Sequence, residues 1–112
     1  MSATLRRHNI KIIEKLTELI DEENHDVKKY AILASEVKTE HPGRAQVFIN
    51  LSMQEEAHQK ALHDEVVKII EMYRKEHGAP PPAMQAVSDH EHKRYIKHME
   101  EARRYQEIYK TT

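Results

Sequence analysis

A glutamate and a histidine stand three residues apart within a regular apolar stripe of this sequence. The stripe repeats in steps of three and four, as one face of a helix does, through Phe48, Leu51, Glu55, His58, Leu62, Glu65, Ile69 and Met72. Side chains three apart on a helix are neighbours, so the Glu55 carboxylate and the His58 imidazole can reach one point in space. An ionised carboxylate in a helical core is costly unless it is compensated, and a bound cation compensates it most directly. The spacing therefore predicts a pair of metal ligands.

The first part of the chain also has an acidic residue within a regular apolar stripe. Its stripe runs through Ile13, Leu16, Ile20, Glu23, Val27, Tyr30, Ala34 and Val37, with one acid where Leu or Ile is expected. In an antiparallel hairpin closed near Pro42, Glu23 lies within about one helical turn of the level of Glu55 and His58. A two-fold axis relating two such hairpins doubles these ligands. The doubled set is that of a di-iron or di-manganese carboxylate site, and zinc would also bind to it. We expect two iron ions per dimer.

The elements that position these residues are predicted to be helices. We expect a single all-α domain over 1–112, in which a long antiparallel helical hairpin (5–77) precedes a Pro-rich linker (78–87) and a shorter third helix (88–110). The first hairpin helix ends before His41-Pro42-Gly43, and the second, from Arg44, ends at Gly78. Ser88-Asp89-His90-Glu91 has the form of a capping box, which predicts the start of the third helix.

A two-helix hairpin cannot cover its own apolar face. A homodimer of hairpins forming a four-helix bundle would bury both stripes most evenly, and we expect at least a dimer. The third helix is the alternative source of cover within one chain.

Composition excludes several classes of protein. The 112 residues carry 18 basic and 19 acidic side chains in mixed order, which is not typical of a nucleic-acid or membrane surface. No apolar run approaches a membrane span, and no signal peptide is recognisable, so the expected location is the cytoplasm. With no cysteine and nine histidines, a metal must be held by carboxylates and imidazoles, and an electron donor must be a separate protein.

The stretch from Glu23 to Tyr30, followed by Glu55-Glu-Ala-His58, resembles the first half of the ferritin and rubrerythrin di-iron bundle. The resemblance covers about 16–72. It implies that Glu23, Glu55 and His58 are metal ligands, that Tyr30 is the auxiliary tyrosine beside the metal, and that the protein is a ferroxidase oxidising Fe(II) with oxygen or peroxide. In its half length the chain is similar to encapsulated ferritins, which complete the site by dimerising. It ends in Lys110-Thr111-Thr112 rather than in an apolar docking peptide, so residence in a protein shell is unsupported.

Other interpretations stay open at this point. A rubrerythrin-like peroxide reductase component would use the same ligands, and a non-catalytic dimerisation module would use Glu and His only to set register. A hemerythrin-like carrier needs several histidines on shared faces, which this spacing does not provide. Glu65 either binds a further ion or pairs with a lysine. We expect surface positions for four of the histidines outside the stripe, His63, His90, His92 and His98.

Overall fold

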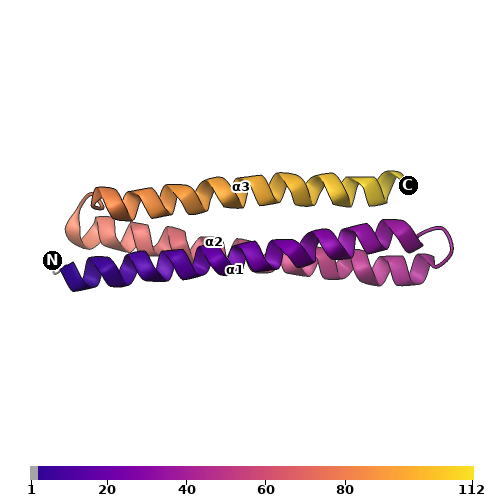
Figure 1. The fold of residues 1–112 in the computed structure, drawn as a ribbon, viewed down its shortest axis with the longest axis horizontal. Coiled ribbons are helices and arrows are strands. Elements are labelled where there is room, and N and C mark those ends of the chain that lie inside the picture. The colour runs from indigo at the N-terminus through magenta and orange to yellow at the C-terminus, as the bar shows by residue number, and fades with distance from the viewer. Residues whose placement is uncertain (1–2) are drawn as a thin grey trace.

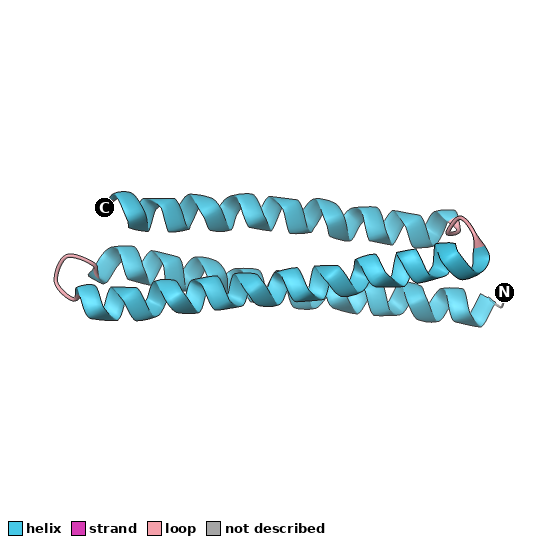
Figure 2. Cartoon of the chain, turned by 180° about the vertical axis from the view of Figure 1, so that it is seen from behind, coloured by secondary structure: helices cyan, strands magenta, loops and turns pink. Residues whose placement is uncertain are grey.

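The computed structural model describes residues 3–112, all of them in helices or short connections (Figure 2). Helix α1 spans Ala3–Val37, α2 spans Pro42–His77 and α3 spans Pro82–Thr111. The three helices lie side by side in a rod measuring 59 × 18 × 17 Å, with α1 and α3 parallel and α2 antiparallel to both (Figure 1). The predicted all-α class with three helices is confirmed.

The helix ends follow the positions of proline and glycine. Pro42 occupies the first turn of α2, where its missing N–H would have no partner in any case, so this helix begins two residues before the predicted Arg44. At the other end, Gly78 adopts φ 86° and donates its N–H to the Arg74 carbonyl at 3.0 Å. That conformation favours glycine and ends the helix.

The third helix begins six residues earlier than the capping box predicted. Pro81 has φ −59° and ψ 154°, an extended conformation, and Pro82 then starts α3. The predicted linker is therefore limited to 78–81. Ser88 lies inside the helix, and the Glu91 side chain is turned toward α2 instead of toward the backbone of Ser88. The capping-box prediction was wrong because two adjacent prolines start a helix without a side-chain cap.

Apolar clusters fill both ends of the rod. One cluster joins Ile13 of α1 and Met84 of α3 to three buried residues of α2, namely Val66, Ile70 and Tyr73. The other joins Ala31 and Ala34 to Ile49. Between these clusters the buried apolar residues Ile20, Val27 and Ala102 are accompanied by several buried polar residues: Asn24, Ser52, Gln59, Glu91 and His98. The middle of this core therefore depends on hydrogen bonds, such as those from Ser52 Oγ to the Val27 carbonyl (2.7 Å) and from Gln59 Nε2 to the Ile20 carbonyl (2.9 Å).

One long face of the hairpin is left open. Helix α3 packs along the other side of α1 and α2, and mainly against α1. The predicted stripe of α2 consequently lies at the edge of the core instead of at its centre, and its Met72 is 60% exposed. Leu19 of α1, one turn from Glu23, is 43% exposed. We call this surface the open face; its apolar residues are Ile12, Leu19, Leu51, Leu62, Ile69 and Met72.

Candidate metal centre

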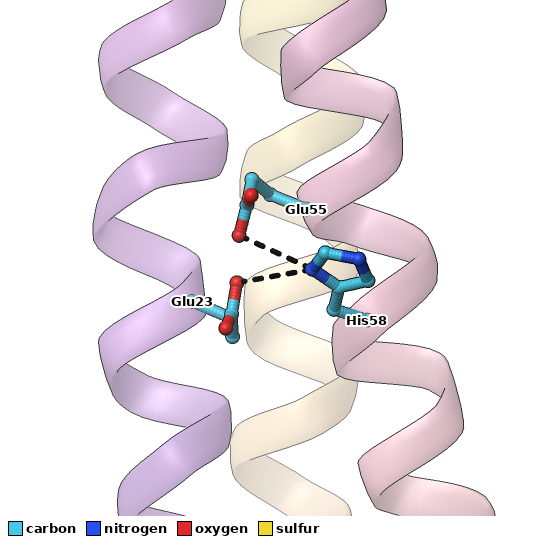
Figure 3. Close-up of side chains that lie close together, drawn as sticks. All are labelled: Glu23, Glu55 and His58. Atoms are coloured by element: carbon cyan, nitrogen blue, oxygen red, sulfur yellow. Dashed lines mark ion pairs between the residues drawn. The ribbon is translucent and has the colours of Figure 1, made fainter.

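The three predicted ligands come together on the open face near the middle of the hairpin. Glu23 projects from α1, and Glu55 and His58 project from successive turns of α2, while α3 passes behind them (Figure 3). One donor atom from each residue lies within 4.8 Å of the others. The antiparallel geometry thus places them at one level, as the helical periodicity predicts.

The three side chains lie close together without hydrogen bonding to one another. His58 Nδ1 is 3.6 Å from Glu23 Oε2 and 3.5 Å from Glu55 Oε2. Glu23 Oε2 is buried and has no hydrogen-bond partner within residues 3–112. Ligands at about 2.0–2.2 Å from a metal ion lie about 3.0–3.4 Å from each other. The two distances from His58 Nδ1 are only slightly longer than this range, and the two carboxylate oxygens lie within 4.8 Å of each other, so the three donors would have to draw together to bind one cation.

This group is only part of a coordination shell. Two carboxylates and one imidazole leave several positions of a six-coordinate ion unfilled. The His58 side chain is 59% exposed on the open face, whereas those of Glu23 and Glu55 are 30% and 20% exposed. The incomplete side of the group therefore faces solvent, where a further ligand or a second chain can approach.

Two other predicted site residues lie outside the cluster. Tyr30 is half-buried two turns along α1, about 10 Å from Glu23 along the helix axis. Glu65 is exposed and accepts a hydrogen bond from Lys68 Nζ at 2.9 Å. The structure thus pairs Glu65 with a lysine, and its role as a ligand and that of Tyr30 as an auxiliary residue stay predictions.

Two further histidine–carboxylate pairs connect α3 to the hairpin, and these were not anticipated. His63 Nδ1 donates to both oxygens of Glu91 at 2.9 and 2.8 Å. His98 Nε2 donates to Asp21 Oδ1 at 2.7 Å, and Arg94 binds the same carboxylate. The predicted surface location was therefore wrong for His63 and His98, although it holds for His90 and His92. The inward face of α3 follows a seven-residue repeat through Met84, Glu91, His98 and Tyr105. The repeat is hard to recognise in the sequence because it contains polar residues.

The electrostatics of the two pairs differ. Burial raises the pKa of Glu91, and the hydrogen bond from His63 opposes this only in part. Burial would also raise the pKa of Asp21, but hydrogen bonds from Arg94 and His98 outweigh it and lower the pKa. Asp21 is thus held as an anion by two donors, whereas Glu91 depends on one imidazole.

Comparison with known proteins leaves the ferritin and rubrerythrin resemblance an expectation. No family model matches the sequence, and neither a curated protein nor a solved structure matches it. Within residues 3–112, none of the helices is both long and apolar enough to cross a membrane.

Proposed function

We propose that this chain is a di-iron ferroxidase whose site forms between two copies. The observation that supports it most is the convergence of Glu23, Glu55 and His58 with a buried carboxylate oxygen that has no hydrogen bond. An uncompensated carboxylate on a helix face destabilises the protein, and a cation at this point reverses the effect.

The ligand types favour a hard divalent ion. Carboxylate oxygens with one imidazole suit iron and manganese, and zinc binds such a set as well. In the proposed reaction Fe(II) is the substrate: two Fe(II) ions each give up one electron, and O₂ takes both with two protons to form H₂O₂. With peroxide as oxidant, H₂O₂ takes two electrons and two protons to form two waters. Glu23, Glu55 and His58 bind and orient the ions, and their charge favours the Fe(III) product.

A second copy fits the open face for two reasons. Its apolar residues lie along the hairpin on both sides of the ligand group, with Leu51 on one side and Leu19 and Met72 on the other. A two-fold axis through that face would bring the second chain's ligands to the same level, which produces the set of four carboxylates and two imidazoles of helical di-iron sites. The second pair of bundle helices then comes from the partner and not from α3.

Anaerobic loading with Fe(II) followed by oxygen or peroxide in stopped flow tests the activity. We expect Fe(III) absorbance with repeated turnover, and loss of at least tenfold in rate for Glu55→Ala, because one of three ligands is removed. Glu22→Ala is the matched control, since Glu22 is exposed and lies outside the cluster. Full activity in Glu55→Ala would overturn the assignment. A strong preference for peroxide would favour the peroxide reductase alternative.

Sedimentation velocity tests the shared site. A ligand that binds only the dimer shifts association toward it by mass action, so chelation should increase the monomer fraction and Fe(II) or Mn(II) should reverse this. An oligomer distribution that is indifferent to metal, at concentrations near the dissociation constant, would favour a dimerisation module without metal.

A further inference from the structure

A second group of side chains suited to ligand binding lies between α2 and α3, away from the open face. Its centre is Glu91, which is 1% exposed. A carboxylate buried to this degree is costly to ionise unless it is hydrogen-bonded. Within residues 3–112 its hydrogen bonds come only from His63 Nδ1. Glu91 therefore has one evident role, which is to hold the imidazole of His63.

This hydrogen bond fixes the tautomer of His63 and leaves its Nε2 available to bind a ligand. Because Nδ1 donates to Glu91, the neutral ring has its lone pair on Nε2. Nε2 makes no hydrogen bond to any part of the chain that the structure describes. The ring is stacked on Tyr95 with centroids 4.1 Å apart and planes 1° from parallel, so its orientation is restricted from two directions. A buried carboxylate that orients a histidine through its other nitrogen is the usual support of a metal-binding imidazole.

A second histidine lies at the distance expected for a shared ion. The His92 and His63 ring centroids are 5.5 Å apart, and the planes are tilted by 36°. With a Zn–N bond of about 2.0–2.1 Å, each ring centre lies about 3 Å from the ion, and a tetrahedral angle separates two such centres by about 5 Å. Both histidines line a cavity of about 200 Å³ between α2 and α3, which has room for the ion and its waters.

We propose that His63 and His92 form a binding site for a borderline divalent cation such as Zn(II), with Glu91 orienting His63. Imidazole pairs suit zinc, copper and nickel better than they suit hard ions, so this site differs in preference from the carboxylate-rich group on the open face. Water completes the coordination shell. Because His63 belongs to α2 and His92 to α3, a bound ion joins the two helices.

The test uses the full chain carrying Glu55→Gln and His58→Ala, which removes two of the three open-face ligands first and so makes the result independent of the proposed ferroxidase. Zn(II) is titrated in competition with a chromogenic indicator. We expect one Zn(II) per chain, an affinity at least tenfold lower in His92→Ala, and no change in His90→Ala, whose exposed histidine is two residues away. Absence of Zn(II) binding, or equal binding in His92→Ala, would overturn the proposal.

Two further measurements separate coordination from a merely structural role. Glu91→Gln retains an oxygen that can accept from His63 Nδ1, so the chain should fold with unchanged helical circular dichroism while Zn(II) affinity falls about tenfold, as it does when supporting residues are altered. Nitrogen-15 NMR should show that the Nε2 signal of His63 shifts on addition of Zn(II) while the Nδ1 signal keeps its protonated character. A His63 Nε2 signal that does not respond to Zn(II) would contradict the proposal.

Discussion

Replacing Glu23 with glutamine should raise the stability of the metal-free protein and lower the stability of the metal-bound protein. Glutamine keeps the shape of the side chain but removes its charge. In the metal-free protein that charge is a disadvantage, because Glu23 Oε2 is buried without a hydrogen bond and a second carboxylate, Glu55, lies beside it. In the metal-bound protein the same charge is a ligand. The sign of the effect should therefore invert.

The magnitude follows from the geometry. The two carboxylates offer oxygens within 4.8 Å of each other, and unit charges at this distance repel by about 1 kcal/mol in water and about 3.5 kcal/mol at an effective dielectric constant near 20. The side chains are 30% and 20% exposed, so solvent screens the pair in part and the repulsion lies between these two values. We expect Glu23→Gln to raise the metal-free stability by about 1–2 kcal/mol, or a Tm increase of about 4–8 °C for a chain of this size.

Thermal unfolding followed by circular dichroism measures both states. The protein is compared at pH 8, where free imidazoles are uncharged, first with EDTA and then with Mn(II), which is stable in air. A ligand at one hundred times its Kd adds about 2.7 kcal/mol to the wild type, and the variant should gain much less. Glu22→Gln, with its exposed side chain, is the control and should change neither Tm by more than about 2 °C.

A lower Tm of Glu23→Gln in EDTA would refute this reasoning. That result would mean that the Glu23 carboxylate takes part in a favourable ion pair with His58, as in a purely structural polar network, and that no cation is needed to compensate it.

Three further predictions concern α3 and the open face. Met84→Ala removes a fully buried side chain of α3 and should cost about 2–4 kcal/mol in urea denaturation; a loss below about 1 kcal/mol would show that α3 is not docked as described. The hydrogen bond from Lys28 lowers the pKa of Glu101. This pair should therefore stabilise the fold by about 0.5–1 kcal/mol above pH 5 and lose that contribution as pH falls below about 4. In Glu101→Gln this part of the pH dependence should be absent. Leu19→Glu should prevent dimerisation in sedimentation velocity, whereas Ile108→Glu, at a site 47% exposed on α3, should not; equal effects would exclude the open face as the interface.

The wrong surface prediction for His63 and His98 has a physical explanation in the packing of α3. Its inward face is set by the seven-residue repeat that includes Glu91 and His98, and acidic and histidine side chains are typical of solvent-exposed positions. Their burial becomes favourable only when His63 and Asp21, on other helices, supply hydrogen bonds. Partners on other helices cannot be recognised from a pattern along one helix, so His63 and His98 were assigned to the surface and Glu91 to a capping box.

The sequence by itself determined the two hairpin helices and the level of the metal-type ligands, because helical periodicity and the positions of Pro42 and Gly78 are local properties of the chain. Glu23, Glu55 and His58 could be brought together from the rise per residue and the position of one turn. Only the tertiary structure decided which face α3 covers. That choice depends on side-chain pairs between helices, such as Lys28 with Glu101, and it leaves the ligand group on the open face instead of in the centre of the core.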